Sequence, residues 1–413
     1  MALLNITLNQ DEILQLLAND RDAAFATLLQ NSLNIILKAE SAAQLKAEPY
    51  ERTEERTGSR NGFRDRPLTT RIGTIILHVP KHRNGEAFHT LIFDNYSRSE
   101  AALIVTMAEM VVNGVSTRKV SQVMETLCGK TYSKSTVSEA CKELDKRVRE
   151  FRERPLTGEY PFLTVDATYF KVRDNGRIIP KAFMIAYATN SEGQREIIGF
   201  GIYANESKQT WNAFLKSLKD RGLHGVKMIT SDAHEGILNA ISKIFPEAAW
   251  QRCQFHFSRN IIDKMPKKYQ KGLSAELQEM FNCKTLGEAR KRKDAIIADY
   301  NDIAEEAMNC LDEGFESAMS IMVLPQYLRK YFRTSNHIER LNKELKRRSK
   351  VIGIFPNEGS LMRLIGSVLV ERNEEIISRK CIYSSKTYQA LLSTEIPSKL
   401  VQIATEQRKL LAA

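Results

Sequence analysis

The chain has 413 residues, of which 42% are hydrophobic and 27% charged, and its length predicts two to four domains rather than a single core. The formal net charge of +11 favours a polyanionic partner. No apolar run approaches the roughly 20 residues of a membrane span, no leader peptide is visible, and the cysteines form no CxxC pair, so we expect a reduced cytoplasmic protein without membrane contact.

Residues 1–48 place apolar side chains at helical spacing, which predicts a helix that docks on its own domain or on a second copy. In the basic stretch that follows, arginines recur every fourth residue. On a helix these arginines would form one stripe that could lie along a phosphate backbone, although nearby glycines indicate that any helix is short. The alternative is that the arginines form an ordinary solvated surface. Residues 76–80 predict a strand. The candidate DNA contacts here are Arg52, Arg56, Arg60 and Arg64.

Residues 100–150 predict three helices. Ser116 is a candidate N-cap of the second helix, and Ser133 or Ser135 of the third. Helix, short turn and helix with exposed basic residues resembles a helix-turn-helix, whereas a helical hairpin that binds nothing would give the same pattern. The candidate DNA contacts of these helices are Arg118 and Lys134.

From residue 161 the pattern changes to strands. Three meandering strands followed by alternating helices and short strands predict a mixed sheet covered by helices. The expected elements span 161–173, 182–189, 196–203, 207–221, 226–230, 233–244 and 248–252. Residues 253–330 are helical throughout, as if inserted into the α/β part, and further helices are expected after the basic stretch that follows them.

The strand at 161–173 carries one acid in its middle. Asp166 lies between apolar neighbours, where an ionised carboxylate is costly unless it is paired or binds a metal. An edge strand with Asp166 facing water is the alternative. The two readings differ in whether this strand is central in the sheet.

Two further acids stand near the starts of helices. Asp232 follows the strand at 226–230, where open α/β sheets place their sites, or else it caps the next helix together with Glu235. Glu339 borders the apolar stripe of a basic helix, or else it belongs to a capping box with Asn336 as N-cap. The candidate DNA contacts around it are Arg333, Asn342, Lys343, Lys346 and Arg347.

Carboxylate ligands suit Mg²⁺ or Mn²⁺, and two such ions can serve both the attacking and the leaving oxygen in phosphoryl transfer. Glu344 lies on the same helix as Glu339 but points roughly 140° away, so we expect it to face solvent or pair with a base.

Cys253 and His256 have the spacing of half a zinc site, without a second pair to complete it. His234 is expected to form a local hydrogen bond.

Eight motifs resemble those of the Mutator-type transposases of bacterial insertion sequences. In chain order they are RNGF (60–63), GVSTRKV (114–120), STVS (135–138), TVDATY (164–169), SDAHEG (231–236), RCQFHFSRNI (252–261), TSNHIERLN (334–342) and VIGIFPNE (351–358). Together, and in this order, they are highly specific. One departure is Ile376, where many members have tryptophan; we expect it to affect packing only.

The resemblance implies a DDE transposase with a ribonuclease-H-like catalytic domain, an all-α insertion and a mainly α N-terminal DNA-binding region. Its catalytic, metal-binding triad falls on Asp166, Asp232 and Glu339, and its Cys/Asp-x-x-His signature on Cys253 and His256, for which a structural or DNA-positioning role is expected. The implied cofactor is Mg²⁺ or Mn²⁺, two ions per site. The implied partners are terminal inverted repeats and target DNA, bound by a homodimer or higher oligomer in the nucleoid.

This interpretation divides the chain into six parts. They are an end-binding region (1–95), a helix-turn-helix-like region (96–155), a first catalytic part (156–252), the helical insertion (253–330), a second catalytic part with the glutamate helix (331–380) and a helical tail (381–413). The expected reaction is cleavage at the element's ends followed by attack of the 3′-OH on DNA, through a circular element. A nuclease without strand transfer and an inert DNA-binding regulator are the alternatives.

Overall fold

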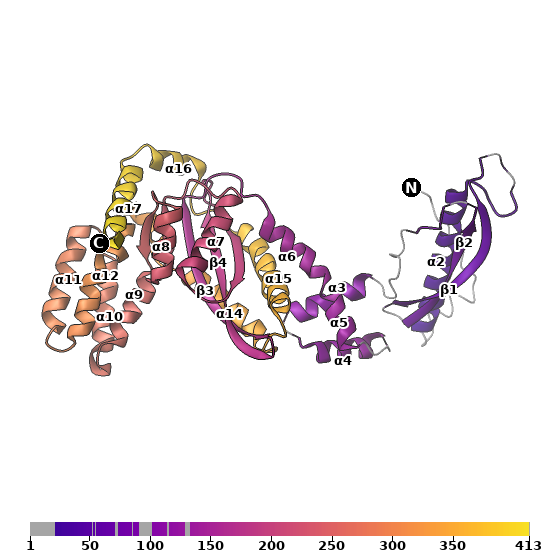
Figure 1. Cartoon of the computed structure of the whole chain (residues 1–413), viewed down its shortest axis with the longest axis horizontal. Coiled ribbons are helices and arrows are strands. Elements are labelled where there is room, and N and C mark those ends of the chain that lie inside the picture. Colours follow the sequence, from indigo (N-terminus) through magenta and orange to yellow (C-terminus); the bar gives the residue numbers. More distant parts are fainter. Residues whose placement is uncertain are drawn as a thin grey trace. The chain divides into compact units, whose positions relative to one another are not determined.

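In the computed structural model the described residues are 21–51, 53, 55–70, 73–84, 86–90, 101–113, 115–128 and 133–412. The chain divides into two compact units, Met1–Glu143 and Leu144–Ala413, and each is described by itself. Figure 1 labels many of the elements of both units. Within the described part of the chain, no helix has the length and apolar character needed to cross a membrane.

The first described element of the first unit is a helix, which packs on a β-hairpin. Helix α2 (Arg21–Leu45) lies against strands β1 (Ser59–Thr70) and β2 (Gly73–Arg83), which pair antiparallel. Apolar side chains from the helix and from both strands form a common core, with Leu37, Leu68, Ile75, Leu77 and Val79 at its centre. The strand expected at residues 76–80 is therefore confirmed as part of β2.

The prediction that these arginines form one stripe on a helix is wrong. Residues 59–70 form strand β1, because their backbone hydrogen bonds are made with β2, and Gly62 adopts a positive φ of 73° at the bulge between Arg60 and Phe63. Arg60 donates to the carbonyls of Ala47 and Glu48, and Arg56 donates to those of Glu51 and Gly58. Arg64 is exposed on β1, and Arg52 lies outside the described residues.

The three helices expected next are present as α3 (Ala101–Val112), α4 (Thr117–Cys128) and α5 (Lys134–Ala140). Ser133 is the N-cap of α5, since its Oγ accepts the Thr136 N–H at 3.1 Å. The third helix is shorter than predicted, because the chain turns at Cys141 and continues as a separate helix, α6 (Glu143–Glu153). The N-terminal region therefore combines helices with a β-hairpin.

The second unit is built on a five-stranded mixed sheet of order β5-β4-β3-β6-β7. Strands β3 (Phe162–Asp174), β4 (Arg177–Thr189) and β5 (Arg195–Tyr203) form an antiparallel meander, whose first turn uses Asn175 and Gly176 at positive φ. Strands β6 (Met228–Ser231) and β7 (Ala249–Arg252) run parallel to β3. Strand β3 is central, so the edge-strand alternative for Asp166 is wrong.

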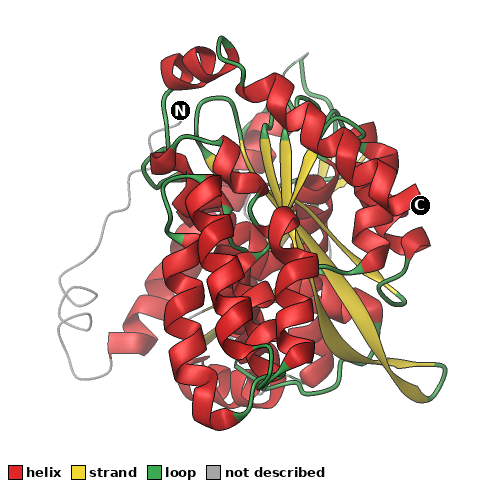
Figure 2. Ribbon diagram, turned by 90° about the vertical axis from the view of Figure 1, so that its left-hand side faces the viewer, coloured by secondary structure: helices red, strands yellow, loops and turns green. Residues whose placement is uncertain are grey.

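Helices cover both faces of this sheet, as Figure 2 shows. Helices α7 (Lys208–Asp220) and α8 (Glu235–Ile244) pack on the face that carries Leu163 and Val165. Because side chains alternate along a strand, Asp166 lies on the opposite face, which α14 (Asn336–Ser349) and α15 (Glu358–Ile377) approach. Trp211 of α7 is fully buried.

The segment between the sheet and α14 is helical, as expected. It comprises α9 (Gln254–Asp263), α10 (Lys267–Phe281), α11 (Leu286–Tyr300), α12 (Glu305–Ala318), η1 (Ser320–Val323) and α13 (Gln326–Phe332). The first four helices share a core of their own around Leu277, Leu311 and Phe315. Helices α16 (Ser385–Leu392) and α17 (Ile396–Ala412) end the chain, and Gln407 ties α17 to Trp250 of β7 by two hydrogen bonds.

Candidate active site

The parallel pairing of β3 and β6 brings two of the predicted acids together. The last residues paired in register are Thr164 of β3 and Thr230 of β6. Asp166 and Asp232 each follow two residues later, so their carboxylates leave neighbouring strands at the same level. The pKa of Asp166 is raised to about 7, first by burial and then by the nearby charge of Asp232.

Asp232 does not cap helix α8, so the capping-box alternative is wrong. His234 is the N-cap, with Nδ1 accepting the Gly236 N–H at 3.1 Å, as expected for a local hydrogen-bonding residue. The Glu235 carboxylate instead lies 2.6 Å from Lys208 Nζ. Asp232 Oδ1 is buried and has no hydrogen-bond partner among the described residues. A buried carboxylate oxygen without a donor is what a bound cation would satisfy.

A third acid that we had not predicted lies beside this pair. Glu206 precedes Ser207, the N-cap of α7, and its backbone N–H donates to the Tyr169 hydroxyl at 3.3 Å. Burial raises the pKa of Glu206, and the charge of Asp232 raises it further. Nothing in the local sequence marks Glu206, because only the return of the chain from β5 to α7 brings it here.

Helix α14 reaches the pair through Asn342. Its Nδ2 donates to Asp166 Oδ2 at 2.7 Å, while its Oδ1 is buried without a partner among the described residues. Asn342 was predicted to contact DNA, and in the structure its amide contacts Asp166. The contact holds one carboxylate oxygen of Asp166 and leaves the amide oxygen available to a ligand.

Glu339 lies one turn earlier on α14 and faces a different neighbour. Ser335, not Asn336, is the N-cap, so the second capping-box alternative is also wrong. Glu339 Oε1 lies 3.6 Å from His256 Nε2 and accepts the Ser335 hydroxyl at 3.3 Å. The pKa of His256 is raised to about 9, chiefly by the Cys253 sulfur and less by Glu339 and Asp166. His256 therefore lies close enough to Glu339 and Asp166 to interact electrostatically with both carboxylates.

Cys253, His256 and Glu339 offer ligand atoms that all lie within 4.8 Å of one another. Cys253 is buried, and its Sγ accepts hydrogen bonds from the N–H and the hydroxyl of Ser335. Across the described residues, the predicted triad does not form such a group. Two donor sets are thus adjacent: carboxylate oxygens at Asp166 and Asp232, which fit Mg²⁺ or Mn²⁺, and a softer sulfur–nitrogen–oxygen set of the kind zinc accepts.

The predicted basic contacts on α14 differ in their surroundings. Lys343 and Lys346 are exposed, and Arg347 pairs with Glu344 at 2.7 Å. Glu344 also binds Arg348 and Arg372, which confirms that it pairs with bases. The other predicted contacts lie elsewhere: Arg333 donates to Asn282, Arg118 is exposed on α4, and Lys134 begins α5 with a side chain outside the described set.

Comparison with known proteins identifies the family. The family profile described as "Transposase, Mutator family" matches residues 2–379. The transposase for insertion sequence element IS256 in transposon Tn4001 of Staphylococcus aureus is 41% identical over 94% of this chain and 99% of its own length. The transposase for insertion sequence element ISRM5 of Rhizobium meliloti is 39% identical over 84% of this chain and 87% of its own length. The transposase for IS1081 of Mycobacterium tuberculosis is 36% identical over 93% of this chain and 95% of its own length.

A solved structure described as the Drosophila P element transposase strand transfer complex also matches, covering 79% of this chain and 86% of that one. It is 11% identical with a TM-score of 0.30, a likeness from which nothing further follows. The family profile and the relatives, by contrast, span most of the sequence and include every element of the candidate site. The chain therefore belongs to the Mutator family of transposases.

Proposed function

We propose that this member of a DNA-cutting and DNA-joining family is a DDE-type transposase of an insertion sequence. It would bind the terminal inverted repeats, cut the DNA there and join the new 3′-OH to another phosphodiester, through a circular form of the element. The observation that carries the proposal is the pair of Asp166 and Asp232 on adjacent parallel strands, with an elevated Asp166 pKa and a buried, unpartnered Asp232 oxygen.

Asp166 and Asp232 would hold a divalent cation, Mg²⁺ or Mn²⁺, and Glu339 would complete the ligand set as the third member of the triad. Such a cation lowers the pKa of an attacking oxygen and stabilises charge on a leaving oxygen. Asn342 would keep Asp166 oriented through its 2.7 Å hydrogen bond. Lys343 and Lys346, exposed on the same helix, would hold DNA phosphates near the carboxylates.

The sheet order supports a ribonuclease-H-like catalytic domain. An antiparallel meander of three strands continues through its first strand into two parallel strands. Asp166 lies within β3, and Asp232 directly follows the neighbouring parallel strand β6. Helices α9 to α12, with their own core, would be the insertion. The N-terminal unit would recognise the element's ends, with Arg64 and Arg118 as exposed contacts, and the active form would be a dimer or higher oligomer on DNA.

The test is a cleavage and strand-transfer assay on labelled DNA that carries the sequences flanking the gene. Wild-type protein with Mg²⁺ is expected to release a 3′-OH end and to join it to a second duplex, and EDTA should abolish both steps. Asp166→Asn and Asp232→Asn should fold and bind the ends but not cut them. An exposed acid, Asp220, gives the matched control Asp220→Asn, which should cut normally.

The same assay separates the two alternatives. Cleavage without any joining of pre-cut ends would indicate a nuclease. Specific end binding without cleavage under any divalent cation would indicate a DNA-binding regulator. Cleavage that survives exhaustive chelation, or that persists in Asp166→Asn, would refute the metal-dependent mechanism proposed for the carboxylates.

A further inference from the structure

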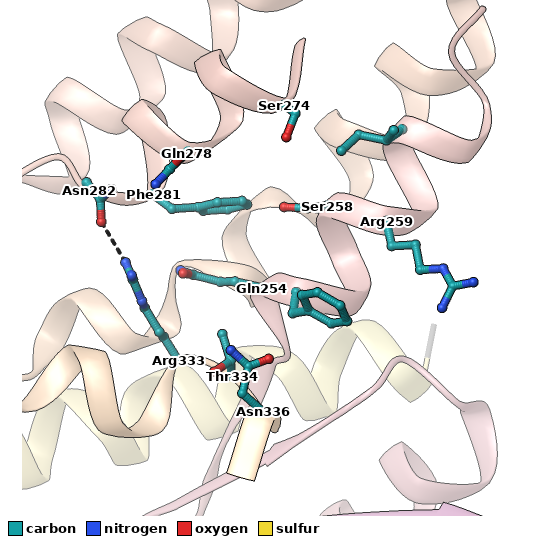
Figure 3. A pocket seen from close by; sticks show the side chains of 12 residues that line it. Gln254, Ser258, Arg259, Ser274, Gln278, Phe281, Asn282, Arg333, Thr334 and Asn336 are labelled. Carbon is teal, nitrogen blue, oxygen red and sulfur yellow. Dashed lines mark hydrogen bonds between the residues drawn. The ribbon is translucent and has the colours of Figure 1, made fainter. Parts of the chain in front are cut away.

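A pocket of about 400 Å³ opens beside the candidate active site, between helices α9 and α10 and the segment that leads into α14. Figure 3 shows its lining. Six of the lining residues define its chemistry, namely Phe255, Gln278, Phe281, Asn282, Arg333 and Asn336. The volume is within the range of roughly 300–1,000 Å³ that is usual for small-ligand sites.

The pocket and the candidate site share two stretches of backbone. Phe255 lies between Cys253 and His256, and the Gln254 N–H donates to the Arg333 carbonyl at 3.0 Å. Asn336 follows Ser335, which contacts both Cys253 and Glu339. A ligand in the pocket would therefore lie beside the two stretches of backbone that carry Cys253, His256 and Ser335.

The pocket offers flat apolar surfaces together with neutral polar groups. The Phe255 side chain is 44% exposed, which is unusual for phenylalanine, and its ring contacts that of His256 at 5.7 Å between centroids. In Figure 3 the Phe281 ring extends between Gln278 and Ser258. The amides of Gln278 and Asn282 can each donate and accept hydrogen bonds.

The same groups argue against an anion as the occupant. Arg333 donates to Asn282 Oδ1 at 2.7 Å, so this guanidinium is already engaged by a neutral amide. The Arg259 side chain points away from the Phe281 ring in Figure 3, and its Nε lies 3.7 Å from Asp263. A planar, uncharged ring with polar edges fits these surroundings better than a phosphate does.

We propose that this pocket receives a single nucleobase, unstacked from the DNA strand whose phosphodiester lies at Asp166 and Asp232. The inference rests on the proposed function and adds a site to it. Phe255 stacks on the base, as aromatic side chains do on extruded or single-stranded bases. Gln278 and Asn282 contact the base edge. Extruding a base bends the strand sharply and presents the adjacent phosphate to the carboxylates.

The experiment uses the full-length protein and duplexes of the gene-flanking ends, each with 2-aminopurine at one position near the cleavage site. Binding is carried out in EDTA, so that no strand is cut. We expect fluorescence to rise strongly at one position and to stay low at its neighbours. Phe255→Ala should lose this signal and should bind or cut about 5- to 150-fold less well, the range of fold-changes for a lost base–aromatic stack.

Matched controls separate the stack from general damage. Tyr327, 52% exposed on α13 and outside the pocket, gives Tyr327→Ala, which should keep the fluorescence change and the activity. Phe255→Trp, which keeps an aromatic ring at this position, should show both the fluorescence change and the activity that Phe255→Ala loses. Replacing the responsive nucleotide by an abasic one should also narrow the difference in cutting between wild type and Phe255→Ala, because no base is left to stack.

Fluorescence that rises equally at all positions, or that is unchanged in Phe255→Ala, would overturn the base pocket while end binding and cleavage still stand. A wild-type protein that neither binds nor cuts its ends would instead overturn the proposed function. A gel shift and a cleavage assay on unmodified DNA distinguish these two results.

Discussion

Glu344 should contribute to folding and not to chemistry, and its replacement by glutamine tests both statements. Its carboxylate accepts four hydrogen bonds from Arg347, Arg348 and Arg372, with lengths from 2.7 to 3.0 Å. The Arg348 side chain is only 4% exposed and retains Glu371 as a partner at 2.9 Å. Glu344→Gln removes a charge from a cluster that holds a buried guanidinium.

The burial of Arg348 sets the size of the expected loss in the free energy of unfolding. Removing one partner of a buried ion pair costs roughly 3–5 kcal/mol when the other charge is left alone. Because Glu371 remains and Glu344 is itself 19% exposed, we expect a loss of about 1–3 kcal/mol in the free energy of unfolding. Cleavage at low temperature should remain close to that of the wild type, since no contact of Glu344 reaches Asp166 or Asp232.

The effect should depend on pH with a definite sign. The hydrogen bonds from Arg347 are the main reason that the pKa of Glu344 is held well below its ordinary value of 4.5, and Arg348 and Arg372 lower it further. Such a carboxyl stabilises the fold above that value and loses its contribution as the pH falls below it. The difference between wild type and Glu344→Gln should therefore be full at pH 7 and shrink below about pH 4.5.

Urea unfolding followed by tryptophan fluorescence measures this. Both tryptophans of the chain, Trp211 and Trp250, lie in the second unit, so the signal reports that unit alone. Glu339→Gln is the companion variant and should unfold like the wild type while neither cutting nor joining DNA. Equal urea midpoints for wild type and Glu344→Gln, a folded but inactive Glu344→Gln, or an active Glu339→Gln would each refute the reasoning.

Three further outcomes are expected. Asn342→Ala should fold but cut DNA roughly 10- to 100-fold more slowly, because it loses a hydrogen bond to the Asp166 carboxylate. Single-turnover cleavage rates measure this effect, and an unchanged rate would count against a positioning role for Asn342. Arg64→Ala should weaken end binding and reduce the steepness of log affinity against log salt by about one, which gel shifts in a salt series would measure. Arg60→Ala, by contrast, should mainly lower thermal stability, because the Ala47 carbonyl loses its hydrogen bond from Arg60. Mg²⁺ should raise the melting temperature of the wild type more than that of Asp166→Asn, and an equal rise in both proteins would exclude a cation at that carboxylate.

Much of the second unit could be predicted because its signals are local. The alternation of side chains in 161–173 and the switches between strand and helix periodicity act over a few residues, so the order of strands and helices was expected correctly. The strand β4 begins earlier than predicted, at Arg177 rather than Ala182, because its pairing with β3 continues past the apolar part of the sequence.

The N-terminal arginines show why the rest could not be predicted. Their spacing of four suits a helix, yet residues 59–70 are held as a strand by β2, which supplies both hydrogen bonds and apolar partners. Such pairing depends on a second segment and not on the period of the first. Tertiary contacts thus overrode the local pattern, and the Arg60 guanidinium donates hydrogen bonds to the backbone carbonyls of Ala47 and Glu48.

For the candidate site, the sequence by itself placed Asp166 within a strand and Asp232 directly after one, because strand periodicity is readable over a few residues. Only the tertiary structure decided that the two strands are neighbours, that Glu206 joins them, and that Asn342 touches Asp166 while Glu339 faces His256. These contacts join segments far apart in the chain, and they form only when the sheet, helix α9 and helix α14 pack together.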